Sequence, residues 1–257
     1  MRPAGVQPRA AVRDPLDMGD GDFVLVAWMT LDAAPGTAAG MWAHLLCPDE
    51  AARATRFVHA HDRDSFVAAH AVLRLLLRRL GHRPARAWRF VPGAHGKPAI
   101  EEAQNPRALD VNLSHARGAV ACAVARGGAV GVDIEDTDRA VGALDLAQAY
   151  FAAEETARLR AAAAPEQEFF RLWTLKEAAV KALGLGLHAP LDRLVVAEEG
   201  ACVRIPDEAP ACWQFRSMAV PPRHRLAVAA RHAPGATPPP VVSVRIGITS
   251  DGGLVPR

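Results

Sequence analysis

Two acidic stretches contain the residue types that could hold a metal ion beside phosphate groups. Asp133 and Glu135 alternate with aliphatic residues, which is the period-two pattern of a strand and turns both carboxylates to the same side. Further along the chain, Glu177 and Lys181 are four residues apart, so on a helix they share one face. Three carboxylates suit a magnesium ion that is shared with substrate phosphates.

Candidate site residues can also have ordinary structural roles, and this applies to Glu177 and Lys181 as well as to two further candidates, His115 and Lys97. Glu177 and Lys181 could form an exposed ion pair, which would contribute only about 0.3 kcal/mol to helix stability. His115 could be a loop histidine without a ligand, and Lys97 a solvated lysine beside a proline turn. The order of several motifs along the chain is therefore a stronger signal than any single motif.

The elements that must position the acidic residues can be predicted from local pattern. Residues 173–183 are strong helix formers without glycine or proline, and Gly184 provides a C-terminal stop. A strand is predicted at 130–135 for Asp133 and Glu135. The site would thus combine one strand with one helix.

The order of predicted elements recurs along the chain at an offset of about 105 residues. The matched pairs are strands 23–28 and 130–135, the helix starts at Asp49 and Glu154, and strands 119–125 and 226–230. This repeat predicts an α+β fold with two pseudo-equivalent α/β lobes and a ligand site in the cleft between them.

The same pattern predicts the domain boundaries. We expect a flexible N-terminal tail at 1–20, an N-terminal lobe at 21–127 and a C-terminal lobe at 128–249 that carries the metal site. The end of the segment 250–257 resembles the remnant of a protease site used in protein expression, so we exclude this tail from the fold.

Composition narrows the classes of function. The chain has 257 residues, of which 50% are hydrophobic, so it can bury a substantial core. Its net charge of +2 is too small to indicate nucleic-acid binding, and no apolar run has the length of a signal peptide or a membrane span. The four cysteines lack zinc-site spacing, which predicts reduced, buried thiols in a cytoplasmic protein.

Taken together, the motifs resemble the paired signature of the 4′-phosphopantetheinyl transferases. That signature corresponds here to residues 131–135 and 173–181, and it is preceded in matching order by residues 96–98 and 112–115. The resemblance is to the larger, surfactin-synthetase-activating type, whose two lobes lie in one chain, and it covers roughly residues 45–230.

This resemblance implies an enzyme that transfers the 4′-phosphopantetheine arm of coenzyme A to a serine of an apo acyl or peptidyl carrier protein, releasing adenosine 3′,5′-bisphosphate. It implies Mg²⁺, or alternatively Mn²⁺, held by Asp133, Glu135 and Glu177. The implied catalytic residues are Glu177, as the favoured base for the serine hydroxyl, and Lys181, as a charge on the pyrophosphate or an alternative proton carrier.

The resemblance also assigns coenzyme A binding to residues of both predicted lobes. One position departs from the family pattern, because Ser65 stands where an arginine would bind the 3′-phosphate, and Arg63 is a nearby substitute. The implied coenzyme A-binding residues are Arg53, Arg56, Arg63, Lys97, Pro98, Ser114, His115 and Lys181.

Two alternative functions stay open at this point. A magnesium-dependent phosphohydrolase could use the same carboxylates with water in place of the carrier serine, and a catalytically silent protein could bind coenzyme A or a carrier protein. We expect a monomer with an acidic carrier protein as its partner and with neither nucleic acid nor membrane as a target. Fatty-acid, polyketide and nonribosomal-peptide carriers are all compatible with these motifs.

Overall fold

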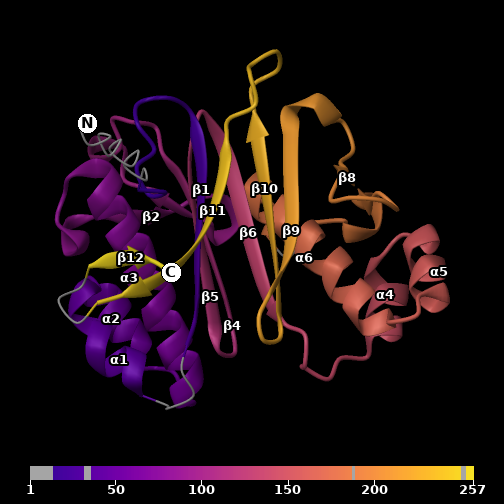
Figure 1. Cartoon of the computed structure of the whole chain (residues 1–257), viewed down its shortest axis with the longest axis horizontal. Helices are drawn as coiled ribbons and strands as arrows, with labels where there is room; N and C mark the ends of the chain where they lie inside the picture. The colour runs from indigo at the N-terminus through magenta and orange to yellow at the C-terminus, as the bar shows by residue number, and fades with distance from the viewer. Residues whose placement is uncertain (1–13, 32–35, 187–188, 250–252) are drawn as a thin grey trace, which may run out of the picture.

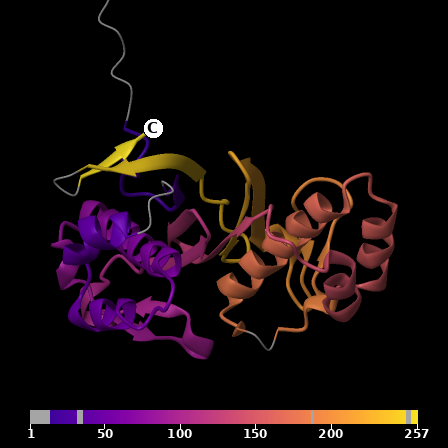
Figure 2. The ribbon, with the colours of Figure 1, turned by 90° about the horizontal axis from the view of Figure 1, so that it is seen from below.

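The computed structural model describes residues 14–31, 36–186, 189–249 and 253–257. Two main sheets lie between two groups of helices, which occupy opposite ends of the long axis (Figures 1 and 2). The larger sheet has the strand order β12-β11-β1-β5-β4, and the smaller has the order β6-β10-β9. The layers are therefore helix, sheet, sheet and helix.

The first lobe is built on the larger sheet. Its long helix α3 spans 22 residues and covers one face of that sheet with aliphatic side chains, because apolar residues recur at helical spacing along it. The elements of this lobe are β1 (Phe23–Thr30), α1 (Thr37–Trp42), α2 (Pro48–Ala54), α3 (Ala60–Gly81), β2 (Phe90–Pro92), β3 (Pro98–Ile100), β4 (Asp110–Ala116) and β5 (Ala119–Arg126).

The second lobe is built on the smaller sheet. Helix α6 covers one face of β6 and β10, and the shorter helices α4 and α5 lie on its outer side (Figure 1). The elements of this lobe are β6 (Gly128–Asp136), α4 (Ala143–Tyr150), α5 (Ala153–Ala161), α6 (Pro165–Leu183), β7 (Val195–Val196), β8 (Val203–Arg204), β9 (Trp213–Val220) and β10 (His224–His232).

The two lobes repeat one arrangement. The order β1-β5-β4 in the first lobe corresponds to β6-β10-β9 in the second, with antiparallel pairing in both. A third apolar core joins the lobes, since aliphatic side chains of β1 and β5 pack against those of β6 and β10. The predicted α+β fold with two pseudo-equivalent lobes is therefore confirmed.

Two segments near the C-terminus differ from the predicted boundaries. Strand β11 (Val241–Ile248), expected in the C-terminal lobe, pairs in parallel with β1 of the first sheet. Strand β12 (Leu254–Pro256), expected outside the fold, pairs with β11. A free sheet edge accepts an extended segment from elsewhere in the chain, which local pattern does not reveal. Residues 1–13 and 250–252 of the predicted tails lie outside the described residues.

The cysteines and helices test two further expectations from composition. All four cysteines are free, as predicted, but only Cys122 and Cys212 are buried, and Cys202 is exposed. In the described part of the chain, no helix combines the length and the apolar composition that a membrane crossing requires.

Candidate active site

Helix α6 lies unusually close to strand β6, and Gly131 makes this contact possible. A Cβ atom at Gly131 would lie 2.0 Å from the carbonyl oxygen of Ala178 and 2.5 Å from the backbone nitrogen of Ala182. Only glycine can occupy this position without displacing the helix. The helix itself begins at Pro165, earlier than predicted, since proline is favoured in a first helical turn. This packing brings α6 over the strand that carries Asp133.

Asp133, Ser114 and Lys181 form one hydrogen-bonded network between the lobes. The Ser114 hydroxyl donates to Oδ1 of Asp133 at 2.9 Å, and the Lys181 ammonium group donates to the same oxygen at 2.6 Å. Lys181 also donates to Oγ of Ser114 at 3.0 Å. The structure therefore joins a predicted metal ligand, a predicted nucleotide-binding residue and a predicted catalytic residue.

The pKa values of the other two predicted metal ligands, Glu135 and Glu177, are both raised. Burial, followed by the negative charge of Asp133, raises the pKa of Glu135 to about 7, although Arg139 and Lys181 act in the opposite direction. Burial, followed by Asp133, also raises the pKa of Glu177, while Lys181 lowers it. The negative charge of Asp133 therefore disfavours ionisation of both Glu135 and Glu177.

These carboxylates match the donor chemistry of a magnesium site but are not assembled into one. Oδ2 of Asp133 is buried and has no hydrogen-bond partner in the described structure. A buried carboxylate oxygen without a partner, next to further carboxylates, suits a hard divalent cation. Within the described ranges, however, no group of three or more histidine, cysteine, aspartate or glutamate side chains is arranged to hold a metal ion. The three-carboxylate metal site therefore stays a prediction.

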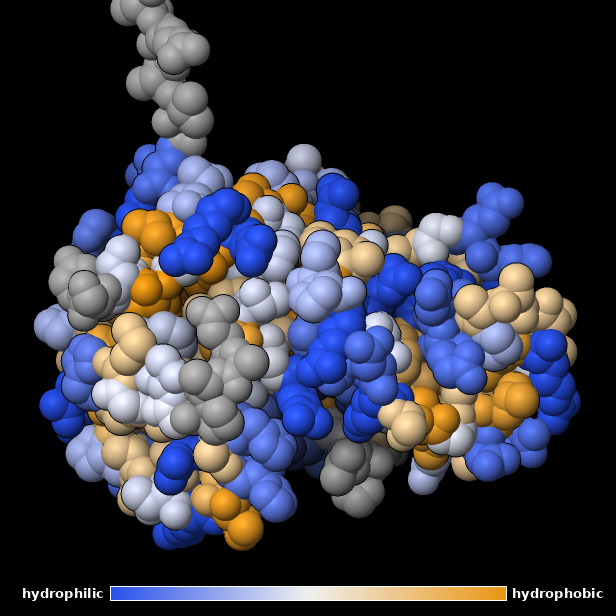
Figure 3. Space-filling model, turned by 60° about the horizontal axis from the view of Figure 1, so that its bottom comes forward, coloured by the Kyte–Doolittle hydropathy of each residue, from blue (hydrophilic) through white to orange (hydrophobic). Residues whose placement is uncertain are grey.

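A cavity of about 270 Å³ lies beside this network. Lys97 and Pro98 of the first lobe and Glu177 and Lys181 of the second lobe line it. On the face shown in Figure 3, hydrophilic residues gather between the two lobes. Four predicted site residues thus face one space that both lobes enclose.

Lys97 has two partners in the structure. Its ammonium group donates to Oδ2 of Asp110 at 2.6 Å and to the carbonyl oxygen of Val130 at 3.0 Å. Because an ammonium group has three protons, one donor is left for a ligand in the cavity. Lys97 therefore links the lobes in addition to any role in binding.

His115 lies near the end of β4, and the positive charge of Arg53 on α2 acts on it. Burial, and then the positive charge of Lys181, lowers the pKa of His115, with a smaller contribution from Arg53. The side chain of His115 nevertheless keeps an exposed part, so an incoming anion could reach it and raise its pKa again. The Arg53 guanidinium lies 5.3 Å from the centre of the Phe66 ring.

The remaining arginines and the Ser65 position are less well placed for coenzyme A. Arg56 is exposed, and Arg63 is half-buried with its Nε atom unpartnered among the described residues. Ser65 is buried, and its hydroxyl donates to the carbonyl oxygen of Ala116 at 3.2 Å. An arginine at position 65 would therefore have no room at this helix–strand contact, whereas Arg63 lies on the same helix with a donor available.

Sequence reasoning did not identify three residues that contact the predicted site. Arg139 lies 3.4 Å from Glu135, and Asp110 and Asn112 contact strand β6 through their side chains. The signal for Asp110 and Asn112 is their alternation with the apolar Val111, which directs polar side chains to one side of a strand. Nothing in the local pattern indicates the partner of Arg139.

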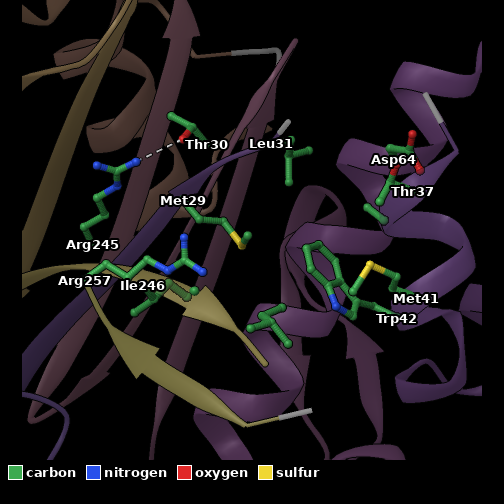
Figure 4. A pocket seen from close by; sticks show the side chains of 13 residues that line it. Met29, Thr30, Leu31, Thr37, Met41, Trp42, Asp64, Arg245, Ile246 and Arg257 are labelled. Carbon is green, nitrogen blue, oxygen red and sulfur yellow. Dashed lines mark hydrogen bonds between the residues drawn. The ribbon is translucent and has the colours of Figure 1, made fainter. Parts of the chain in front are cut away.

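A second pocket, of about 280 Å³, lies on the first lobe away from these carboxylates (Figure 4). Met29 and Trp42 contribute to its wall, and it contains none of the predicted site residues. Its acidic residue, Asp64, accepts hydrogen bonds from the backbone N–H groups of Gly36 and Ala39 and so serves helix α1. The interlobe cavity is therefore the candidate site.

Comparisons with known proteins agree with this arrangement. The 4′-phosphopantetheinyl transferase superfamily matches residues 129–229. The 4′-phosphopantetheinyl transferase psf-1 of Bacillus pumilus is 31% identical over 191 residues, which cover 71% of this chain and 78% of that protein. The transferase Sfp of Bacillus subtilis is 29% identical over 73% of this chain and 83% of its own length. The 4′-phosphopantetheinyl transferase HetI of a Nostoc species is 34% identical over 155 residues, which cover 59% of this chain and 65% of that protein.

The fold and the site define a two-lobed α+β protein in which Glu177, Lys97 and Lys181 line one interlobe cavity and Lys181 is hydrogen-bonded to Asp133. The chain belongs to the 4′-phosphopantetheinyl transferase superfamily.

Proposed function

We propose that this protein transfers the 4′-phosphopantetheine arm of coenzyme A to a serine of an apo carrier protein, and that the interlobe cavity is the active site. The observation that carries the proposal is the Lys181–Asp133–Ser114 network beside Glu177, at a cavity with walls from both lobes. The similarity to named transferases supports the same reaction.

In this reaction the serine oxygen forms a bond to the phosphorus of the pantetheine phosphate. The bond between that phosphorus and the bridging oxygen breaks, and adenosine 3′,5′-bisphosphate leaves. Lys181 would hold the negative charge of the pyrophosphate. Glu177 would accept the serine proton, with Lys181 as the alternative proton carrier.

Magnesium would be held by Asp133, Glu135 and Glu177, with the unpartnered Oδ2 of Asp133 as the best-supported ligand atom. When bound, the ion would supply charge neutralisation for the pyrophosphate. Manganese has the same preference for oxygen ligands and is a second candidate.

Coenzyme A would lie across the two lobes. Its 3′-phosphate and nucleotide would be held by Lys97, Ser114 and His115 together with Arg53 and Arg56, with Arg63 in place of the arginine absent at Ser65. We further propose a monomer, because one chain already contributes both lobes of the cavity, with an acidic carrier protein as partner. A cytoplasmic location is proposed because all four cysteines are free.

Intact mass spectrometry tests the reaction directly. An apo carrier protein is incubated with this protein and coenzyme A, with magnesium and then with a chelator, using fatty-acid, polyketide and nonribosomal-peptide carriers in turn. A gain of one phosphopantetheine only when magnesium is present supports the proposal. Release of the bisphosphate from coenzyme A without a carrier would instead identify a hydrolase, and binding of coenzyme A without either reaction would identify a silent binding protein.

A further inference from the structure

Strands β4 and β6 are the facing edges of the two main sheets. In the described part of the chain, β6 pairs through its backbone with β10 alone, and β4 with β5 alone. Every second N–H group of β6 therefore points away from its pairing partner and towards the other lobe. Backbone N–H groups enclosed in this way require acceptors.

Side chains of β4 provide these acceptors at three alternate positions. We call this set of contacts the side-chain ladder, because it takes the place of backbone pairing between the two strands. Its donor–acceptor pairs are the Val130 N–H to Oδ2 of Asp110 at 2.7 Å, the Val132 N–H to Oδ1 of Asn112 at 2.9 Å, and the Ile134 N–H to Oγ of Ser114 at 3.3 Å.

The two lysines of the candidate site attach to the same stretch of β6. Lys97 donates to the carbonyl oxygen of Val130 at 3.0 Å, and Lys181 donates to the carbonyl oxygen of Val132 at 3.2 Å. The side-chain ladder thus sets the positions at which both ammonium groups meet the strand. Lys97 is tied to the ladder a second time through its ion pair with Asp110.

Register on β6 decides which groups enter the site. Asp133 and Lys181 are held together within the second lobe, because β6 pairs with β10 and packs under α6. A shift of β6 by two residues against β4 would therefore move both groups by about 7 Å relative to Ser114 and Lys97 of the first lobe. We propose that Asp110 and Asn112 are positioning residues, which fix the register of β6 against β4 and so hold Asp133 and Lys181 of the second lobe opposite Ser114 and Lys97 of the first. This inference rests on the proposed function for its effect on turnover, and on the geometry alone for its effect on β6.

Asn112→Leu is the central variant, because leucine has a similar volume but no acceptor for the Val132 N–H group. The matched control is Asn105→Leu. Asn105 also exchanges side-chain hydrogen bonds with backbone, donating to the carbonyl oxygen of Leu109 and accepting from its N–H group, both at 2.8 Å. It precedes β4, and among the described residues its side chain makes no hydrogen bond to β6. Asn112 lines the interlobe cavity and Asn105 does not, so the KM for coenzyme A is measured for both variants.

Hydrogen–deuterium exchange of β6 and steady-state transfer kinetics are measured on each full-length variant. For Asn112→Leu we expect the Val132 amide to exchange about tenfold faster, as loss of one buried acceptor predicts. Turnover should fall about tenfold, with the KM for coenzyme A changed less than about twofold. Asn105→Leu should leave β6 exchange and turnover near those of the unaltered protein.

A second pair of variants distinguishes two roles of Asp110, which accepts a hydrogen bond from the Val130 N–H group and forms an ion pair with Lys97. Asp110→Asn retains an oxygen for the Val130 N–H group and should keep most of the turnover, whereas Asp110→Ala should lose it. This rescue by the conservative change would not occur if Asp110 acted only through its charge on Lys97, because both variants would then behave alike.

The inference would be overturned if a folded Asn112→Leu protein showed unchanged hydrogen–deuterium exchange at the β6 amides. It would also be overturned if Asn112→Leu lost no more turnover than Asn105→Leu. If Asn112→Leu fails to fold, equal turnover in Asp110→Asn and Asp110→Ala would overturn it instead. If the unaltered protein transfers nothing to any carrier, the proposed function fails while the exchange data still decide whether the side-chain ladder holds β6.

Discussion

The hydroxyl group of Ser114 lies 2.9 Å from Oδ1 of Asp133, across the boundary between the two lobes. The sequence assigns these residues to different ligands, Ser114 to the nucleotide and Asp133 to the metal. In the structure they share one hydrogen bond and also share Lys181 as a partner. A change on the coenzyme A side of the cleft is therefore expected to affect the acidic side as well.

Glu177→Gln should reduce transfer at least about 100-fold, because it removes the charge and basicity of the proposed base while keeping its shape. Thermal stability should stay within about 2 °C, since glutamine keeps the size of the side chain and removes a carboxylate whose ionised form is disfavoured by burial. Transfer is followed by mass spectrometry of the carrier. Glu166→Gln, in the first turn of the same helix, is the control. Full activity with intact magnesium dependence would contradict the assignment.

Lys97→Ala should raise the KM for coenzyme A about tenfold, because one positive charge that would hold the 3′-phosphate and nucleotide is lost. The ion pair with Asp110 and the bond to Val130 are lost as well, so a small drop in melting temperature is expected. Arg204→Ala removes an exposed charge from the second lobe and serves as the comparison. A large fall in turnover at saturating coenzyme A, with an unchanged KM, would show that Lys97 acts mainly on catalysis.

Glu50 should make stability depend on pH in the acid range. Burial acts to raise its pKa, but hydrogen bonds from His70 and Arg74 outweigh this effect and lower the pKa to about 2. Because the folded pKa lies below the unfolded value of 4.5, the stabilisation is fully present above about pH 5 and is lost as the pH falls towards 2.

Denaturant titrations from pH 3 to pH 7 check this expectation. Glu50→Gln should cost about 2 kcal/mol at pH 7 and progressively less below pH 4. The exposed Glu102, changed to Gln, should alter the free energy of unfolding by less than about 0.5 kcal/mol throughout. A cost for Glu50→Gln that stays constant down to pH 3 would rule out the lowered pKa as its source.

Lys176, next to Glu177 in sequence, should be a stability residue. Its ammonium group and the Glu155 carboxylate are both fully buried and lie 2.5 Å apart, and the ammonium group also donates to the carbonyl oxygen of Leu191 at 2.7 Å. Lys176→Met should destabilise the protein by about 3–5 kcal/mol, because Glu155 is left as an unpaired buried charge.

The double variant Lys176→Met with Glu155→Gln tests the cause of that loss. It removes the unpaired charge. The glutamine also keeps an amide oxygen that can accept the hydrogen bond from the Val196 N–H group, which Oε1 of Glu155 accepts at 2.8 Å in the unaltered protein. Stability should recover by about 1–2 kcal/mol relative to Lys176→Met. Equal stability of the single and double variants in denaturant titrations would mean that the loss arises from packing instead.

Local pattern predicted the elements with a clear period. Strands β1, β4, β5, β6 and β10 and the core of α6 follow alternation or helical spacing, because the residues they bury recur with that spacing. Strand β9 has mixed polarity on both faces, and β7 has only two residues, so neither carries enough of a pattern to be recognised.

The sequence by itself determined the family, the two-lobed fold and the types of side chain at the site. These features depend on short motifs of neighbouring residues, such as residues 131–135, which can be read directly from the sequence. Only the tertiary structure decided which groups meet. The partners of Ser114, Lys97 and Asn112 lie on a strand of the other lobe, and β11 joins the first sheet from the far end of the chain. Contacts between distant segments depend on how two cores pack together, and no local period encodes that packing.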